Sequence, residues 1–210
     1  VSLKEINRTS LVAYYPFNGN ANDESGNNRN LTEYGSIQLT HDRFGNSNSA
    51  YLFDGSNDYL NHTDDIPNLN NYTISLWAKA NSSGQWESVF SSRGVSSNDN
   101  GFQIDSDTNS NFRMVTNNGD ILNLGSFKLY EWNLITITAD NSLGKTSGYL
   151  NGVYVDNVSS VSSTFYFDGF KIGTNRRGDA YFNGVIDDVK IYDRVLSPLN
   201  IEFLYSIQEN

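Results

Sequence analysis

Residues 18–28 are rich in asparagine, aspartate, glutamate and serine, and two glycines interrupt them. A calcium ion takes roughly six to eight oxygen ligands from carboxylates, amide side chains and backbone carbonyls. This run offers all three kinds of oxygen, so it is a candidate calcium-binding loop. The alternative is a solvated turn that holds no ion.

A second run places oxygen side chains at alternate positions, namely Asp105, Asp107, Asn109 and Asn111. This spacing matches the first half of an EF-hand loop. However, Ser110 stands where that loop needs glycine, and Thr116 stands where it needs a bidentate glutamate. A hairpin loop is the better interpretation, and a weaker second ion site is the alternative.

Aromatic and guanidinium side chains in polar, loop-like segments suit the recognition of sugars. An aromatic face can stack on a sugar ring, and the fork of an arginine binds carboxylate or sulfate groups. The candidate ligand-binding residues of this kind, with one acidic neighbour, are Trp86, Arg93, Arg176, Arg177, Asp179 and Tyr181. The alternative is that the arginines pair locally with acidic neighbours.

The sequence gives little support for catalysis. Retaining glycosidases need two carboxylates roughly 5 Å apart, which a strand provides when acidic residues lie two or four apart on one face. The seven glutamates are scattered, and no strand of that kind is present. His41 and His62 are the only imidazoles, and each lies in a polar, loop-like context without a nucleophile motif, so we expect both in open loops. We therefore expect a protein that is not an enzyme.

Composition and charge exclude several classes of partner. The 210 residues include no cysteine and carry a net charge of -10, and such a surface repels phosphate backbones over about a Debye length. Nucleic acid is therefore not an expected partner. No apolar run approaches the roughly 20 residues of a membrane helix, so membrane insertion is not expected either.

The elements that must position these side chains are predicted to be strands. The chain holds 30 asparagines, 13 tyrosines and 12 phenylalanines, and Asn-Gly or Asp-Gly dipeptides occur seven times. Aromatic residues favour strands and Asn-Gly favours tight hairpins. The clearest case is a two-residue hairpin over Gly148–Asn157, with Asn151 and Gly152 at its turn.

Further segments with alternating or β-branched residues predict strands. They are Leu11–Phe17, Ala50–Phe53, Tyr72–Ala80, Ser88–Ser91, Phe102–Asp105, Phe112–Thr116, Leu134–Ala139, Phe170–Gly173 and Phe182–Tyr192. A dozen or so short strands with hairpin spacing is typical of an antiparallel sandwich. We expect one domain over residues 11–210, after a loose lead-in over residues 1–10.

One short helix is predicted near the C-terminus. Ser197 can cap it, Pro198 suits its first position, and Leu199, Phe203 and Leu204 give it an apolar stripe. The two tryptophans inside strand patterns, Trp77 and Trp132, are predicted to lie in the core.

Three segments together carry a resemblance to a known family. They are L-V-A-Y-Y-P-F-N-G-N-A-N-D-E-S-G-N at 11–27, D-R-F-G with A-Y-L-F-D-G between 42 and 55, and F-N-G-V-I-D-D-V-K-I-Y-D-R-V-L-S at 182–197. In content and order they resemble bacterial laminin-G-like domains of the concanavalin A-like lectin and glucanase superfamily, over about residues 11–205. The resemblance implies an all-β, two-sheet antiparallel jelly-roll sandwich whose first and last strands are neighbours.

Many such domains hold a structural Ca²⁺ between the loop after the first strand and the closing strand. Carried over position by position, the resemblance implies the ligands Asp23, Asp187, Asn20, Ser25, Gly26 and Asn28. Period-two spacing places Asp187 on the face of Val185, Val189 and Ile191, where a carboxylate is costly unless it is paired or metal-bound. The alternative is that Asp187 accepts backbone N–H bonds without an ion.

The resemblance also implies a function. Ligands of such domains usually meet loops at one end or the concave sheet, so the run 174–181 is the expected ligand contact. We expect a noncatalytic, calcium-stabilised, lectin-like module that binds a polysaccharide or glycan, anionic if the arginines bind it. It would be a monomer as an isolated domain and part of a larger secreted or cell-surface bacterial protein. The alternatives are a protein-interaction or adhesion domain without sugar affinity, and a jelly-roll glycan hydrolase or lyase.

Overall fold

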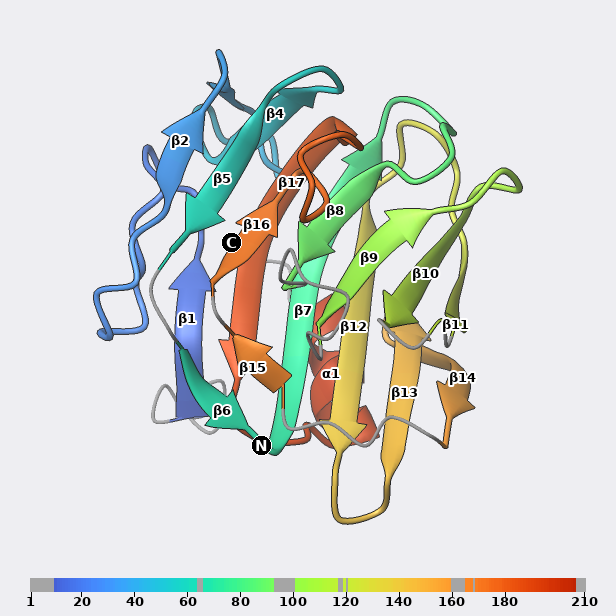
Figure 1. Cartoon of the computed structure of the whole chain (residues 1–210). Helices are drawn as coiled ribbons and strands as arrows, with labels where there is room; N and C mark the ends of the chain where they lie inside the picture. The colour runs from blue at the N-terminus through green and yellow to red at the C-terminus, as the bar shows by residue number, and fades with distance from the viewer. Residues whose placement is uncertain are drawn as a thin grey trace.

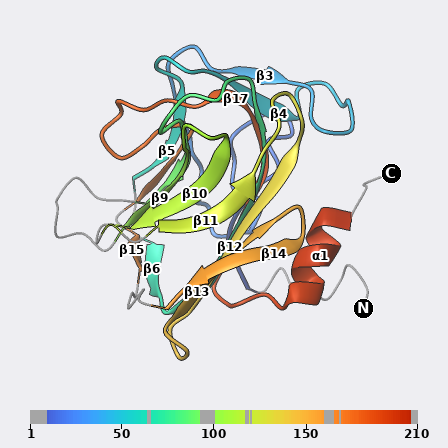
Figure 2. The same ribbon diagram turned by 90° about the vertical axis from the view of Figure 1, so that its right-hand side faces the viewer.

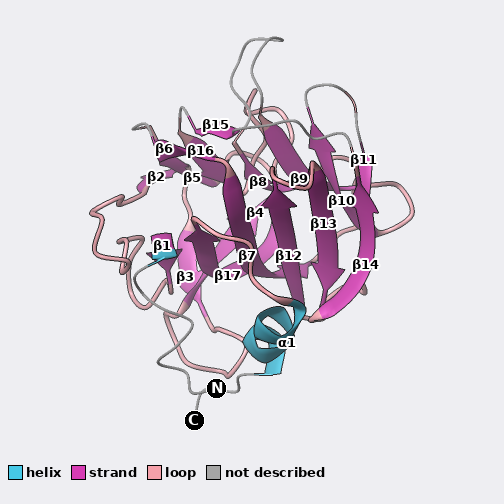
Figure 3. Cartoon of the chain, turned by 90° about the horizontal axis from the view of Figure 1, so that it is seen from below, coloured by secondary structure: helices cyan, strands magenta, loops and turns pink. Residues whose placement is uncertain are grey.

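Two antiparallel sheets face each other across one core (Figure 1). The computed structural model describes residues 10–63, 66–92, 101–116, 119, 121–159, 165–167 and 169–206. The view from below separates the two layers (Figure 3). The predicted jelly-roll sandwich is confirmed, whereas residues 1–9 of the predicted lead-in lie outside the described residues.

The larger sheet has eight strands. In spatial order they are β14 (Val153–Val158), β13 (Lys145–Leu150), β12 (Asn133–Asp140), β7 (Asn71–Ala80), β17 (Asn183–Tyr192), β4 (Ala50–Asp54) and β3 (Gln38–Thr40), with β1 (Leu11–Tyr15) paired to β17 off this path. β4 pairs with the first half of β17 and β1 pairs with its second half. The first and last strands are therefore neighbours, as the resemblance implied.

The second sheet has seven strands and carries the candidate site on its outer face. In spatial order they are β11 (Ile121–Ser126), β10 (Asn111–Thr116), β9 (Phe102–Ser106), β8 (Ser88–Ser91), β16 (Phe170–Ile172), β5 (Tyr59–His62) and β2 (Thr32–Tyr34). A separate pair joins β6 (Ile66–Leu69) to β15 (Phe165–Phe167). Each of the nine strand segments predicted from residue patterns overlaps an observed strand, although the predicted ends Phe17, Gly173 and Phe182 lie outside β1, β16 and β17.

Alternation along β9 and β10 decides which side chains face the core. Phe102, Ile104, Phe112 and Met114 are fully buried in the main core. The intervening residues of both strands therefore lie on the outer face of the sheet. An alternating strand in one layer of a sandwich thus supplies packing on one side and polar chemistry on the other.

The predicted hairpin is confirmed, because Asn151 and Gly152 have φ values of 53° and 79° between β13 and β14. His62, by contrast, is not in an open loop as predicted. It lies in β5 with 4% of its surface exposed, and its ring centroid is 5.3 Å from that of Phe170. Aromatic packing across the strand pair outweighs the polar sequence around it. Trp77 is buried as predicted, whereas Trp132 is only partly buried.

The C-terminal helix α1 (Pro198–Ser206) packs beside β14 (Figure 2). The Ser197 hydroxyl caps it by accepting a hydrogen bond from the Asn200 N–H at 3.3 Å. The predicted stripe is wrong at Leu199, which is 76% exposed, while Ile201 and Leu204 are buried. Leu199 and Leu204 are five positions apart, which places the two side chains about 140° apart around the helix.

Candidate functional site

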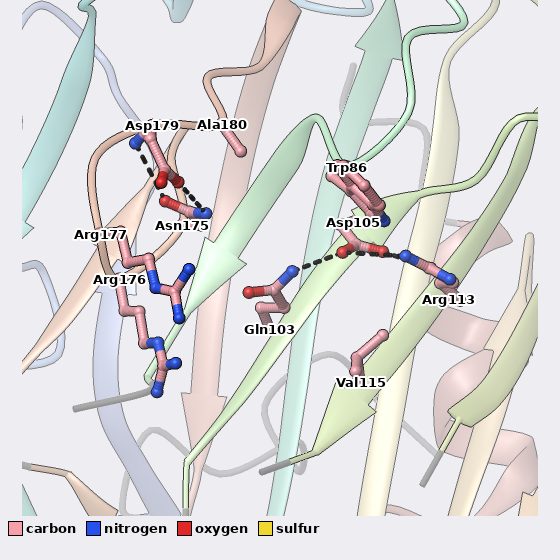
Figure 4. Close-up of a pocket in the computed structure, with 10 residues that line it drawn as sticks. All are labelled: Trp86, Gln103, Asp105, Arg113, Val115, Asn175, Arg176, Arg177, Asp179 and Ala180. Carbon is pink, nitrogen blue, oxygen red and sulfur yellow. Dashed lines mark hydrogen bonds and ion pairs between the residues drawn. The ribbon is translucent and has the colours of Figure 1, made fainter. Parts of the chain in front are cut away.

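A cavity of about 500 Å³ opens on the outer face of the seven-stranded sheet. We call it the sheet pocket. Its lining residues are Trp86, Gln103, Asp105, Arg113, Val115, Asn175, Arg176, Arg177, Asp179 and Ala180 (Figure 4). Its volume is typical of a small-ligand site. β9 and β10 form its floor, and the loop over residues 174–181 forms one wall.

The floor of the sheet pocket is organised by the carboxylate of Asp105. Arg113 lies directly opposite it on β10, and the Arg113 Nε donates to Asp105 Oδ1 at 2.7 Å. The amide nitrogen of Gln103 donates to the other oxygen at 2.5 Å. Asp105 is fully buried. It therefore fixes the orientation of two side chains that reach the cavity.

Two opposing effects set the proton affinity of Asp105. Burial raises the pKa of its carboxyl above the ordinary range, and the donors from Arg113 and Gln103 act against that rise. Because the Gln103 amide nitrogen is committed to Asp105, its oxygen lies on the side toward Arg176 and Arg177 (Figure 4). This leaves a hydrogen-bond acceptor directed at the space between floor and wall.

Asn175 holds the wall of the pocket in shape. Its side-chain oxygen accepts hydrogen bonds from the N–H groups of Gly178 and Asp179 at 3.0 and 3.2 Å. Its amide nitrogen donates to Asp179 Oδ1 at 2.7 Å. The backbone oxygen of Arg176 accepts a further hydrogen bond from Lys171 Nζ at 3.1 Å. The loop is thus braced by side chains, which positions the two arginines at its tip.

Positive charge collects in the sheet pocket, although the chain as a whole is acidic. Three arginines and two aspartates line it, whereas the chain has a net charge of -10. Asp105 is already paired with Arg113, and within the described part of the chain Arg177 forms no ion pair. Both loop guanidinium groups project toward the strand that carries Gln103 (Figure 4). The pocket therefore suits an anionic or hydroxyl-rich ligand.

Trp86 supplies the aromatic surface of the pocket. Its side chain is 53% exposed, and its backbone has a φ of 68° just before β8. The Trp86 N–H donates to the oxygen of Ser106 at 2.7 Å, which ties the residue to the end of β9. An indole ring held in the open beside polar groups can stack on a flat, weakly polar ring face.

The structure brings together four of the six residues predicted to bind ligand. Trp86, Arg176, Arg177 and Asp179 line the same cavity. Tyr181 lies outside this lining, and its ring centroid is 6.5 Å from that of Tyr59. Arg93 lies outside the described residues. Ligand contact by any of them remains a prediction.

Six lining residues were not among those predicted by name: Gln103, Asp105, Arg113, Val115, Asn175 and Ala180. The last two lie in the run 174–181 that was predicted as the ligand contact. Alternation along β9 and β10 could have placed the first four on the outer face. No local pattern of residues indicates that the loop over residues 174–181 covers that face. The predicted hairpin between the two strands is confirmed, since Asp107 Oδ1 accepts hydrogen bonds from the N–H groups of Asn109 and Asn111.

The loop predicted to bind calcium is organised by hydrogen bonds to Asp23. Its carboxylate accepts from the N–H groups of Tyr14, Ser25 and Arg29 and from the Ser25 hydroxyl, at 2.9–3.0 Å. Partial burial of Asp23 acts to raise its pKa, but these donors outweigh it and lower the pKa. Asn20 accepts from the N–H of Asn22 at 2.8 Å. Hydrogen bonds within the loop and from Tyr14 therefore account for the shape of this turn.

Asp187 forms a buried ion pair with Arg43. Arg43 Nη1 lies 2.8 Å from Asp187 Oδ2, and Arg43 Nη2 lies 3.3 Å from Asp188 Oδ2. The guanidinium carbon is 4.3 and 4.9 Å from the ring centroids of Phe44 and Trp77. Burial raises the pKa of Asp187 above its ordinary range, with Asp188 adding to the rise and Arg43 opposing it. The positive charge that faces the Asp187 carboxylate is therefore the guanidinium group of Arg43.

The predicted face of Asp187 holds for Val185 but is wrong for Val189 and Ile191, which lie in the main core. β17 has a bulge after Asp187, where Asp188 adopts a φ of 54°. The bulge shifts the alternation by one residue, so Ile186 and Val189 lie in the main core. Asp187 pairs in register with Trp77 and points to the outer side of the sheet, where Arg43 meets it.

The predicted calcium ligands do not form one cluster in this structure. The Tyr14 N–H donates to Asp23 Oδ1, and the Tyr14 backbone oxygen accepts a hydrogen bond from the Glu24 N–H. On its other side β1 pairs with β17, where Tyr14 lies opposite Lys190. Strand β1 therefore lies between Asp23 and Asp187. Ser25, Gly26 and Asn28 stay with Asp23 in the first loop. No group of three or more His, Cys, Asp or Glu side chains within the described ranges is arranged to hold a metal.

The chain matches a known protein family. The sequence model of the family Laminin_G_3, described as concanavalin A-like lectin/glucanases superfamily, matches residues 54–202. The comparison with curated proteins finds no match. No helix in the described part of the chain has the length and apolar character needed to cross a membrane.

Several solved structures share the fold. Domain 4 of AbnA, a GH43 extracellular arabinanase from Geobacillus stearothermophilus, was solved with arabinotriose. It is 21% identical with a TM-score of 0.78, covering 94% of this chain and 98% of that one. The binding domain of botulinum neurotoxin DC was solved with SialylT, at 17% identity and a TM-score of 0.73 over 95% of this chain. The same domain was solved with rat synaptotagmin II, at 19% identity and a TM-score of 0.74 over 95% of this chain. This chain spans about half the length of those toxin chains, at 51% and 52%.

Proposed function

Because this chain belongs to the concanavalin A-like lectin/glucanases superfamily, we propose that it is a noncatalytic module that binds carbohydrate in the sheet pocket. The observation that carries this proposal is the convergence of an exposed indole, two loop guanidinium groups and the polar floor around one cavity. Sugar binding needs a ring face for stacking and directed hydrogen-bond groups for hydroxyls. A domain of similar fold was solved with arabinotriose, which supports the ligand class.

The carboxylates of the sheet pocket are poorly placed for hydrolysis. Asp105 is fully buried and holds Arg113 and Gln103. Asp179 belongs to the wall, where Asn175 binds it, and the two carboxylates lie on different sides of the cavity (Figure 4). Glycoside hydrolysis needs two carboxyl groups that flank one bond. We therefore propose binding without catalysis.

The charge of the sheet pocket favours an acidic glycan. Arg176 and Arg177 stand at the rim with their guanidinium groups directed inward. A planar guanidinium matches the geometry of a carboxylate or sulfate. The proposed ligand is thus a polysaccharide or glycan that carries uronate or sulfate groups.

We propose the same setting for the module as the resemblance implied: a monomeric domain within a larger secreted or cell-surface bacterial protein. The extracellular arabinanase that contributed a similar domain supports this setting. The alternative of a protein-interaction domain rests on the toxin binding domain solved with synaptotagmin II. Calcium remains a prediction from the resemblance, and the observed ligand positions give it no shared site.

A glycan array followed by calorimetry tests the proposal. The array should contain neutral and acidic oligosaccharides, and acidic ones should bind. Trp86→Ala should weaken binding at least tenfold, because it removes the stacking surface. Tyr130→Ala is a matched control: Tyr130 is 67% exposed with a φ of 65°, and it lies outside the pocket lining. Silence across the array, or equal effects of the two variants, would contradict the proposal, and silence would favour the protein-interaction alternative.

A further inference from the structure

A second group of polar aromatic residues lies beside the sheet pocket. Tyr34 on β2 and Tyr59 on β5 are paired directly across the strands, with ring centroids 4.5 Å apart and planes 2° apart. Tyr181 approaches Tyr59 from the loop, and Lys171 Nζ lies 5.3 Å from the Tyr59 ring centroid. We call these four residues the tyrosine row. It brings three phenol groups and one ammonium group together on the outer face of the sheet.

The tyrosine row and the sheet pocket share a wall. Ala180 lines the pocket, and the next residue, Tyr181, contacts the row. Lys171 of the row donates to the backbone oxygen of Arg176, whose side chain lines the pocket. The two groups are therefore on opposite sides of one braced loop. In the sheet, β5 is three strands from β9, or about 14 Å at roughly 4.8 Å per strand.

The ammonium group of Lys171 has unused capacity for binding an anion. An ammonium has three donors, and the one bond described for it goes to Arg176. No carboxylate in the described part of the chain pairs with it. Burial lowers the pKa of Lys171, which reflects the cost of keeping this charge partly desolvated. An acidic ligand group would offset that cost.

We propose that the tyrosine row is a second subsite for an acidic sugar, so that the glycan is a polyanionic chain lying across the strands. One acidic group meets Arg176 and Arg177, and another meets Lys171, while phenol hydroxyls of the row bond sugar hydroxyls. This proposal rests on the proposed function of the sheet pocket. It adds a specificity-determining role for Lys171 and a minimum ligand length greater than one ring.

Calorimetry with oligosaccharides of two lengths tests the second subsite. The probes are the di- and hexasaccharides of galacturonate and of mannuronate. Lys171→Met keeps the apolar stem and removes the charge. It should weaken hexasaccharide binding about tenfold, the loss expected for one charge-assisted hydrogen bond. Disaccharide binding in the pocket should weaken much less, because there Lys171 acts only through its bond to the Arg176 backbone. Equal losses at both lengths would assign Lys171 to the wall alone and overturn the second subsite. Arg177→Gln should weaken both lengths.

Lys145→Met is the matched control, because Lys145 Nζ also lies over a tyrosine ring, 5.8 Å from that of Tyr154, but in the other sheet. It should bind both lengths like wild type. If Lys171→Met also binds both lengths like wild type while Arg177→Gln loses both, the second subsite is wrong and the pocket stands. If wild type binds only neutral glycans, the polyanionic ligand is wrong. If it binds no glycan on the array, both proposals fail.

Discussion

Arg113 and Asp105 face each other across β9 and β10 and form an ion pair of 2.7 Å with a carboxylate that solvent does not reach. Removing one member of such a pair leaves the other desolvated and alone. Asp105→Asn should therefore lower the free energy of unfolding by about 1–3 kcal/mol. In the Asp105→Asn background, Arg113→Gln should lower the free energy of unfolding only slightly further. Chemical denaturation of the two single variants and the double variant measures this coupling, and strictly additive losses would contradict it.

Gly173 positions the base of the loop that forms the pocket wall. Its φ is 85°, its N–H donates to Val89, and its oxygen accepts from Phe182. A Cβ at this position would lie 2.2 Å from the buried Phe53 ring. Gly173→Ala should cost about 1–3 kcal/mol more than Gly19→Ala, because Gly19 has the same φ and open space around it. Equal melting temperatures for the two variants would contradict this packing.

The ion pair between Arg43 and Asp187 predicts a large effect on stability. Both side chains are nearly buried, with 10% and 3% of their surfaces exposed. Arg43→Met should lower the free energy of unfolding by about 3–5 kcal/mol, because it leaves a buried carboxylate without its partner. Adding Asp187→Leu should recover part of that loss. Recovery is the decisive result, since a purely steric role of Arg43 would make the double variant worse.

Acid should weaken the first loop through Asp23. The pKa of this carboxyl is lowered in the folded chain, so its contribution is present above about pH 4, the unfolded value, and is lost as the pH falls through the folded value. Asp23→Asn should cost about 1 kcal/mol at pH 7, since the group is partly exposed. The difference between wild type and variant should shrink toward pH 2. A difference that does not change with pH would contradict this role.

Calcium titration decides between the resemblance and the observed ligand positions. The positions of Asp23 and Asp187, on opposite sides of β1, predict that EDTA and added Ca²⁺ leave the melting temperature unchanged. Native-state binding would raise it with ligand concentration. A rise that Asp23→Ala or Asp187→Ala abolishes would support the calcium prediction and require the loops to rearrange.

Local patterns in the sequence predicted the fold well because alternation and turn chemistry are local properties. The Asn151-Gly152 hairpin and the strand around Phe102 and Ile104 follow directly from them. The site was harder to predict because its contacts are distant in sequence. Arg43 and Asp187 are separated by 144 positions. In addition, no local pattern of residues indicates the bulge at Asp188 that turns Asp187 outward.

The residues of the sheet pocket were predictable from the sequence only in part. The chemistry of Trp86 and Arg177 could be recognised from residue types, and both line the cavity. Their partners on the floor, such as Gln103, depend on which strand face the loop covers. That relationship arises from the sheet order, in which β16 lies between β8 and β5. It is a property of the tertiary structure, which short-range patterns do not encode.

We propose above that acidic glycans bind on the outer face of the seven-stranded sheet. Titration of isotope-labelled protein with hexagalacturonate, followed by amide and indole NMR shifts, locates the binding face directly. Shifts should concentrate at the Trp86 indole, the Gln103 side-chain amide and the backbone of residues 175–179. Shifts confined to α1 and β14, or no shifts at millimolar glycan, would contradict the claim.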